Sequence, residues 1–209
     1  MPNALVIGAT GLVGRECVRQ LVAHPRVERV VVLARRPLPP DLRHPQLQTI
    51  LAEFDRLESQ PEAFRVSHVF CALGTTIKQA GSRERFHEVD YGYPLRVAEL
   101  ARAAGARHYL LVSSLGANPR SRVFYNRVKG ELEQAIIALG FPSVTIIRPS
   151  LLLGDRDEFR LGEAIAKRLT WAFPPKYRAV QARDVARTLV EAAAEDRVGV
   201  RVVENREIA

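Results

Sequence analysis

Short apolar runs alternate along this chain with amphipathic segments, and this alternation constrains the fold more than any other feature. Each run is continuously apolar, so a strand formed from it must be buried on both faces. Such strands, separated by helices, predict a doubly wound parallel α/β sheet of about seven strands with helices on both faces. The predicted strands span 3–8, 29–34, 47–52, 68–73, 108–114, 143–149 and 200–205, and the predicted helices 12–24, 83–105, 123–140 and 182–196.

The chain length of 209 residues suits one domain, predicted to span residues 1–209. The residues after Pro149 are too few for a separate substrate domain of ordinary size. They contain an amphipathic segment at 158–173 and the final helix and strand. We expect residues 149–209 to complete the sheet and cover the edge formed by the carboxyl ends of its strands, where ligands bind in such folds.

A glycine-rich turn, "VIGATGLVG", joins the first predicted strand to the first helix. Gly8 permits the tight turn, Gly11 lets the backbone approach a pyrophosphate, and Gly14 allows close packing of helix on strand. Free amides at the start of the helix then receive the phosphates of a dinucleotide. The residues of the turn expected to contact this cofactor are Gly8, Thr10, Gly11, Leu12, Val13 and Gly14.

The residues after the second strand indicate which dinucleotide is bound. Sites that prefer NAD(H) carry an acidic residue there, but this chain has Ala34 followed by Arg35 and Arg36. A guanidinium binds a 2′-phosphate that a carboxylate would repel, so NADP(H) is favoured over NAD(H). We expect Arg35 to bind the phosphate and Arg36 to stack on adenine. Asp55, after the third strand, either accepts a hydrogen bond from the adenine amino group or caps the following helix.

Tyr125 and Lys129 are four residues apart in a predicted helix and therefore lie on the same side of it. The positive charge of Lys129 favours the phenolate, so Tyr125 can exchange a proton with a carbonyl or alcohol oxygen during hydride transfer. Ser113 and Ser114 end the preceding strand and point to opposite faces. We assign Ser114 as the hydroxyl that orients the substrate, and expect Ser113 to satisfy backbone groups.

These motifs, in this order, resemble the short-chain dehydrogenase/reductase superfamily with its Rossmann-type fold. The segments "CALGTTIKQAG", "VSSLGA", "FYNRVKGELE", "IRPSLLLGDRDEFRLGE" and "VVENREIA" are similar to the Tat-interacting-protein group among its atypical and extended NADPH-binding members. The resemblance implies further cofactor contacts and a role for Lys129 at the nicotinamide ribose. The positions implied are Leu73, Gly74 and Thr75 after the fourth strand, and Pro149, Ser150 and Leu151 after the sixth.

Composition limits the partners and the cellular setting. The net charge of +8 is spread along the chain without interleaved aromatics, which disfavours nucleic-acid binding. No segment is typical of a membrane span or signal peptide. Two unpaired cysteines predict free thiols in the cytoplasm, and the histidines show no metal-ligand spacing, so no metal is expected.

Two functions are consistent with these observations. The first is an NADP(H)-dependent oxidoreductase that reduces a small carbonyl compound, using Tyr125, Lys129 and Ser114. Only eleven residues separate Ser114 from Tyr125, which indicates a small or open substrate site. The second is an NADP(H)-binding redox sensor that acts through a regulatory protein partner. The sequence leaves a homodimer open in either case.

Overall fold

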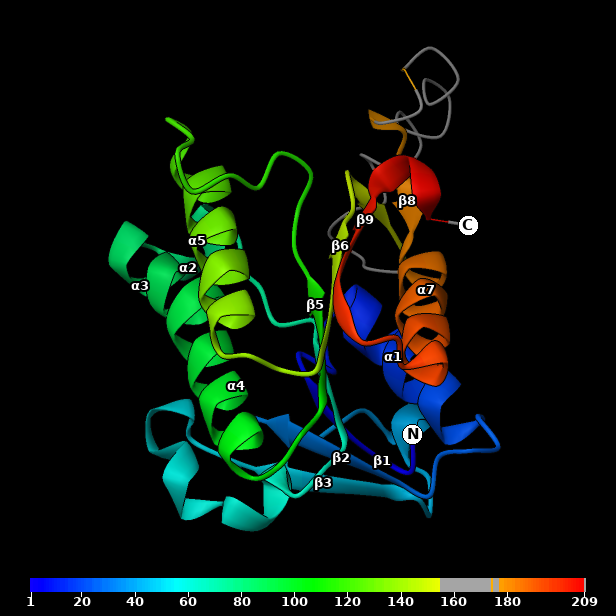
Figure 1. Ribbon diagram of the computed structural model, residues 1–209. Helices are drawn as coiled ribbons and strands as arrows, with labels where there is room; N and C mark the ends of the chain where they lie inside the picture. Colours follow the sequence, from blue (N-terminus) through cyan, green and yellow to red (C-terminus); the bar gives the residue numbers. More distant parts are fainter. Residues whose placement is uncertain (155–173, 175–176, 209) are drawn as a thin grey trace.

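The computed structural model describes residues 1–154, 174 and 177–208, and its centre is a seven-stranded, entirely parallel sheet (Figure 1). The strand order is β3-β2-β1-β4-β5-β6-β9. The strands are β1 (Asn3–Ile7), β2 (Arg29–Ala34), β3 (Leu47–Leu51), β4 (His68–Cys71), β5 (His108–Val112), β6 (Ser143–Arg148) and β9 (Gly199–Glu204). The predicted fold class is confirmed, and the strand bounds differ from the predicted ones by at most two residues.

Helices cover both faces of this sheet, as Figure 1 shows. They are α1 (Leu12–Val22), α2 (Ile77–Ala80), α3 (Arg83–His87), α4 (Tyr93–Ala103), α5 (Phe124–Ala138) and α7 (Ala182–Glu195). The helices α1 and α7 pack together on one face, against Ala4 and Val6 of β1, whereas α4 and α5 cover the other face, against Leu5 and Ile7. Alternate residues of an inner strand thus belong to two cores, which explains why the inner strands are continuously apolar. The edge strands β3 and β9 are largely exposed and contain polar residues, so the expectation that every strand is buried on both faces is wrong for these two, because no further strand or helix of the described residues covers them fully.

The helix predicted over 83–105 is divided by a π-helical turn, Glu88–Gly92, between α3 and α4. Pro94 stands near the start of α4 and has no N–H to donate to the carbonyl of Asp90, so the regular helical ladder is interrupted at this point. The wide turn holds Asp90 in the interior, with none of its surface exposed.

The C-terminal part of the chain adds the last strand of the sheet. Strand β9 runs parallel to β6, from Ser143↔Gly199 to Arg148↔Glu204. A separate two-stranded ladder joins β7 (Leu152–Leu153) to β8 (Val180–Gln181). The predicted amphipathic segment 158–173 lies outside the described residues, and the assignment of residues 1–209 to one domain stays a prediction.

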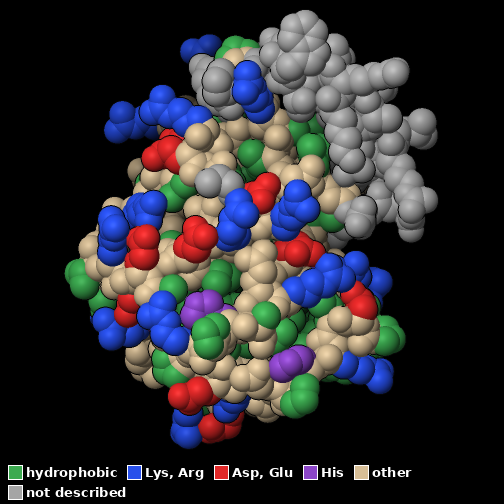
Figure 2. All heavy atoms as spheres, turned by 90° about the vertical axis from the view of Figure 1, so that its right-hand side faces the viewer, with side chains coloured by type: hydrophobic (Ala, Val, Ile, Leu, Met, Phe, Trp, Pro, Cys, Tyr) green, Lys and Arg blue, Asp and Glu red, His purple; other side chains and the backbone are tan. Residues whose placement is uncertain are grey.

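The surface over α1 and α7 carries both signs of charge. In Figure 2, which views this side of the molecule, Lys and Arg side chains are interspersed with Asp and Glu rather than gathered in one field. Ion pairs such as Arg19 with Asp41 and Arg187 with Asp184 belong to this pattern. None of the helices in the described part of the chain has the length and apolarity needed to cross a bilayer.

Candidate functional site

A cavity of about 570 Å³ lies at the carboxyl ends of β1, β2 and β4, the edge where the sequence places the cofactor. Its walls come from the glycine turn, from the segments after β2 and β4, and from α2 and the neighbouring helices. Of the predicted cofactor contacts, the lining includes Gly8, Thr10, Gly11, Arg35, Arg36, Leu73, Gly74 and Thr75. The cavity therefore corresponds to part of the predicted site, at the glycine turn and the two arginines.

The glycine turn has the geometry expected from the sequence. Gly8 has a φ of 83°, and a Cβ there would lie 2.4 Å from the carbonyl carbon of Ala72 on the adjoining strand segment. At Gly14, a Cβ would lie 2.1 Å from the carbonyl oxygen of Gly8, so only glycine lets α1 pack this closely. Helix α1 begins after Gly11 without a side-chain cap. Its first amides are therefore available to an anion.

Arg35 and Arg36 follow β2 directly, are exposed and line the cavity. Neither forms an ion pair with any residue that the structure describes. Two cationic side chains without acidic partners, beside uncapped helix amides, make this end of the cavity suited to a phosphate group.

Asp55 does not cap a helix. It lies inside the short 3₁₀ helix Phe54–Ser59, whose N-cap is Glu53, and its Oδ1 accepts a hydrogen bond of 2.8 Å from the Tyr93 hydroxyl. The capping alternative is therefore wrong, because the carboxylate is directed across to α4. Asp55 is also absent from the cavity lining, whereas the adjacent Phe54 is part of it.

Lys129 is buried and paired with a carboxylate that the sequence reasoning missed. Its Nζ lies 2.7 Å from Oδ1 of Asp90, with side chains only 5% and 0% exposed. Burial by itself would lower the pKa of Lys129, but Asp90 and then Tyr125 outweigh it, so the pKa is raised and the ammonium stays charged. The other oxygen of Asp90 accepts a 2.8 Å hydrogen bond from the amide of Thr75. One carboxylate thus connects the lysine to the cavity-lining loop.

Tyr125 lies in the first turn of α5, half-buried against the ring of Phe86, with ring centroids 5.6 Å apart. The Nζ of Lys129 is 6.0 Å from the centre of its ring, so the two predicted residues share one face of the helix. The Tyr125 hydroxyl makes no hydrogen bond to the residues described. It is therefore left available to a ligand.

The two serines after β5 have different surroundings. Ser113 is buried and its hydroxyl donates to Glu133 of α5, so the expectation that it satisfies backbone groups is wrong. Glu133 also pairs with Arg148, at 2.6 Å. Its carboxylate therefore faces β5 and β6, where it accepts the hydrogen bond from Ser113. The Ser114 hydroxyl has only a long contact, 3.4 Å, with the carbonyl of Leu115. Ser114 is consequently the freer of the two hydroxyls.

The segment after β6 lies beside the loop after β5, because the amide of Leu115 donates to the carbonyl of Pro149 at 2.8 Å. Pro149 directly follows Arg148, the last residue of β6. Ser150 bonds through its amide to Asn205 and through its hydroxyl to the carbonyl of Arg178, while Leu151 is 51% exposed. Several predicted residues lie outside the cavity lining: Leu12, Val13, Gly14, Asp55, Ser114, Tyr125, Lys129, Pro149, Ser150 and Leu151.

A signal for Asp90 was present in the sequence. Phe86, Tyr93 and Val97 recur at helical spacing and are buried. Asp90 lies four residues after Phe86 and three before Tyr93, so it falls on the same side of the predicted helix. A charged residue on an apolar helical stripe requires a buried partner. Lys129 and its partner are separated by 39 positions, however, so no local pattern identifies the pair.

Comparisons with known proteins agree with this geometry. A family model described as NAD(P)H-binding matches residues 8–196. The chain is 38% identical over 177 residues to the protein fmp52, mitochondrial, of Emericella nidulans, covering 80% of this chain and 74% of that protein. It is 33% identical over 177 residues to protein HTATIP2 of Rattus norvegicus, covering 84% and 73%.

Solved structures match the fold. MoeE5 in complex with UDP-glucose and NAD has a TM-score of 0.77 at 21% identity, over 96% of this chain and 74% of that one. The UDP-glucose 4-epimerase of Thermotoga maritima with UDP-glucose has a TM-score of 0.74 at 16% identity, over 97% and 76%. At these identities the likeness concerns the fold alone.

The names of the fungal relatives contradict one prediction. The proteins from Emericella nidulans, Scheffersomyces stipitis and Lodderomyces elongisporus are all named mitochondrial. The prediction of a cytoplasmic location is therefore wrong by this comparison. It rested on two cysteines, which are indeed free and buried, but free thiols do not distinguish one reducing compartment from another.

Proposed function

The chain belongs to the NAD(P)H-binding family, within the atypical short-chain dehydrogenases/reductases, and from this premise we propose that it is an NADP(H)-dependent oxidoreductase acting on a small carbonyl compound. The observation that carries this proposal is the position of the Lys129 ammonium. It lies 6.0 Å from the Tyr125 ring centre and 3.6 Å from where a Cβ on Gly74 of the cavity wall would be. One buried cation thus lies between the candidate acid and the candidate cofactor cavity.

The residues of the cavity fit a dinucleotide. Uncapped amides at the start of α1 and the glycine turn suit a pyrophosphate, and a Cβ at Gly8 or Gly14 would collide with the backbone that shapes this turn. Arg35 and Arg36, which form no ion pair with the described residues, support a 2′-phosphate, and hence NADP(H) over NAD(H), because no acidic residue follows β2 directly. When bound, the cofactor supplies a hydride to the carbonyl carbon, or accepts one from the alcohol.

The chain's own residues supply the proton and the orientation. Tyr125 donates its phenolic proton to the carbonyl oxygen, and the charged Lys129 stabilises the phenolate that results. Ser114, whose hydroxyl makes only a long contact with the carbonyl of Leu115 among the described residues, donates a hydrogen bond to the same oxygen. Asp90 holds Lys129 and the amide of Thr75 in place, so it positions the lysine and the loop rather than the substrate.

Cofactor preference is tested by fluorescence titration with NADPH and NADH. Replacing Arg35 with alanine removes a charge-assisted contact worth about 1.5–3 kcal/mol, so NADPH affinity should fall by about tenfold or more while NADH affinity is unchanged. Arg43→Ala removes an exposed arginine that does not line the cavity and serves as the control. Equal losses for both cofactors, or none, would refute the phosphate assignment.

Catalysis is tested with Tyr125→Phe, which keeps the ring against Phe86 and removes only the hydroxyl. NADPH should still bind, and turnover of a carbonyl substrate found by screening should fall by about 10²–10⁴-fold. Wild-type turnover in this variant would reject Tyr125 as the acid. A different result is a wild type that binds NADPH but turns over no compound in a broad panel of carbonyls and alcohols. That result would favour the alternative function, an NADP(H)-binding redox sensor that acts through a protein partner.

A further inference from the structure

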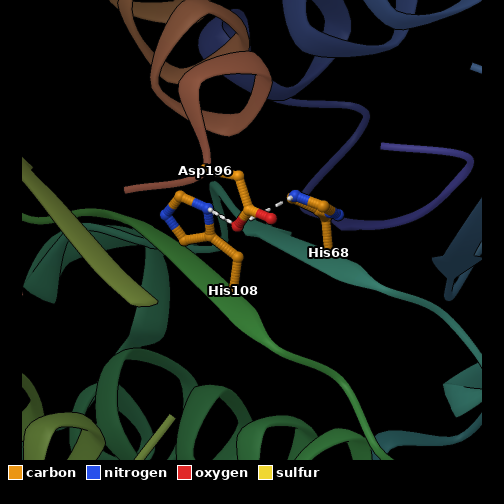
Figure 3. Close-up of side chains that lie close together, drawn as sticks. All are labelled: His68, His108 and Asp196. Atoms are coloured by element: carbon orange, nitrogen blue, oxygen red, sulfur yellow. Dashed lines mark ion pairs between the residues drawn. The ribbon is translucent and has the colours of Figure 1, made fainter. Parts of the chain in front are cut away.

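Three titratable side chains meet at the edge of the sheet opposite the cofactor cavity (Figure 3). His68 begins β4 and His108 begins β5, and the two residues are direct neighbours in the parallel register. Asp196 is the C-cap of α7 and points between the two rings. The histidines are 2% and 1% exposed, so this is a buried cluster, and the proposed oxidoreductase chemistry uses none of its members.

Each member directs one unpartnered atom into the space between them. Among the described residues, Nε2 of His68, Nδ1 of His108 and Oδ1 of Asp196 have no hydrogen-bond partner of good geometry, and they lie within 4.8 Å of one another. The aspartate oxygen is 3.7 Å from the first nitrogen and 3.4 Å from the second. Buried polar atoms are nearly always satisfied, so three such atoms converging on one point favour a cation between them.

In both histidines, the ring nitrogen that faces away from Asp196 lies beside a hydroxyl. Nδ1 of His68 lies 2.8 Å from Oγ of Ser67, whose own proton is donated to the carbonyl of Asn3. The serine oxygen must therefore accept from Nδ1–H, which leaves a lone pair on Nε2 of the neutral ring. Nε2 of His108 lies 3.0 Å from Oγ1 of Thr145, a hydroxyl that can accept from Nε2–H or donate to Nε2. Metal-binding histidines typically donate their other ring N–H to an oxygen acceptor, and the Ser67 hydroxyl is such an acceptor for His68.

Nε2 of His68 and Oδ1 of Asp196 are directed at each other across 3.7 Å. A lone pair on Nε2 then faces a carboxylate oxygen, an arrangement that is repulsive without a positive charge between the two atoms.

We propose that His68, His108 and Asp196 bind a divalent first-row transition metal such as Zn²⁺. Ligands about 2.0–2.1 Å from a tetrahedral zinc lie roughly 3.4 Å apart, close to the separations between the aspartate oxygen and the two nitrogens. Two imidazoles and one carboxylate suit such metals better than Mg²⁺ or Ca²⁺, which prefer oxygen ligands. The side chain of Asp196 is 26% exposed, but its Oδ1 is buried like the two nitrogens, so the site consists of three enclosed protein ligands.

Two neighbouring groups act on this site in opposite directions. The C-terminus of α7 carries the negative end of the helix dipole and attracts a cation. Arg107 repels one, but its Nε lies 3.2 Å from Oδ2 of Asp196, the oxygen that is not directed at the histidines. The guanidinium therefore orients the carboxylate while lowering the affinity. A bound metal would fasten the end of α7 to the starts of β4 and β5.

The test is calorimetric titration of the metal-stripped full chain with Zn²⁺, together with the visible spectrum after Co²⁺ addition. We expect one saturable ion per chain. Asp196→Asn should weaken Zn²⁺ binding by more than about tenfold. This variant should fold, because Asp196 has a left-handed φ of 46° that asparagine also tolerates.

Two further variants make the test specific. Arg107→Ala should tighten Zn²⁺ binding, since it removes the repelling charge, whereas a purely structural cluster would show no such gain. His44→Gln, which replaces an exposed histidine elsewhere, should change nothing. No saturable binding, or binding equal in the wild type and Asp196→Asn, would overturn the proposal and leave the cluster as a hydrogen-bonded contact.

Discussion

Replacing Asp90 with asparagine should be among the most damaging conservative changes in this protein. The variant keeps the shape of the side chain and an oxygen for the amide of Thr75, but leaves the Lys129 ammonium without a countercharge. Removing one partner of a buried pair costs about 3–5 kcal/mol, a large share of the roughly 5–15 kcal/mol that stabilises a typical domain. Urea denaturation at neutral pH measures the loss directly.

A second variant separates the charge effect from the loss of packing. Asp90→Asn combined with Lys129→Met removes both charges, and replacing a whole buried pair by neutral groups is often nearly without cost. The double variant should therefore be more stable than Asp90→Asn alone. Glu99→Gln breaks a surface pair with Arg96 on the same helix and should cost less than about 1 kcal/mol.

The dependence of stability on pH gives an independent check, because the wild type and Asp90→Asn should respond to rising pH in opposite directions. In the wild type the pKa of Lys129 is raised above its ordinary 10.5, so the stability from the pair is complete below that value and lost as the pH rises through the raised pKa. In Asp90→Asn, burial dominates and should lower this pKa. The unfolded chain then binds the additional proton, and the variant should gain stability as the pH rises toward 10.5.

Two results would refute this reasoning about the buried pair. One is a loss of less than about 1 kcal/mol for Asp90→Asn, the value expected of an exposed pair. The other is a double variant no more stable than the single one, which would mean that the asparagine acts through packing and not through the orphaned charge.

Two further changes test the packing around the cofactor turn and the state of the thiols. Gly14→Ala should lower the free energy of unfolding, measured by urea denaturation, by about 1–3 kcal/mol and weaken NADPH binding, since α1 must move away from the Gly8 carbonyl. The control Gly92→Ala should be tolerated, because its Cβ would meet only a side-chain atom at 4.0 Å. Cys17 and Cys71 are fully buried, and burial raises the pKa of both thiols. Neither should react with a maleimide at neutral pH until the chain unfolds, and rapid labelling of the native protein would contradict this.

The sheet and the phosphate turn could be predicted because their signals are local. A parallel strand buried on both faces must be apolar throughout, and the approach of Gly14 to Gly8 excludes any side chain, so both features are visible within about ten residues. Helix periodicity likewise places Tyr125 and Lys129 on one face.

The partners of the charged residues could not be predicted, because they depend on packing between distant elements. Asp55 receives its hydrogen bond from Tyr93, 38 positions away, and so does not cap its own helix. His68 and His108 meet through strand register, and Asp196 joins them from the end of α7. Spacing along the chain contains none of this information. The expectation of no metal was based on the spacing of the histidines in the sequence, whereas the proposed site combines residues that are distant in the sequence.

The π-helical turn Glu88–Gly92 makes the site sensitive to the number of residues between α3 and α4. A π turn closes its hydrogen bonds over one residue more than an α turn, so a one-residue deletion between Asp90 and α4 would let a regular α-helix form and would displace Asp90 from its place in the wide turn. Asp90 would swing out of the interior, and both Lys129 and the loop at Thr75 would lose their shared anchor. A single-codon deletion should thus disable the site while leaving every side chain implicated in chemistry unchanged.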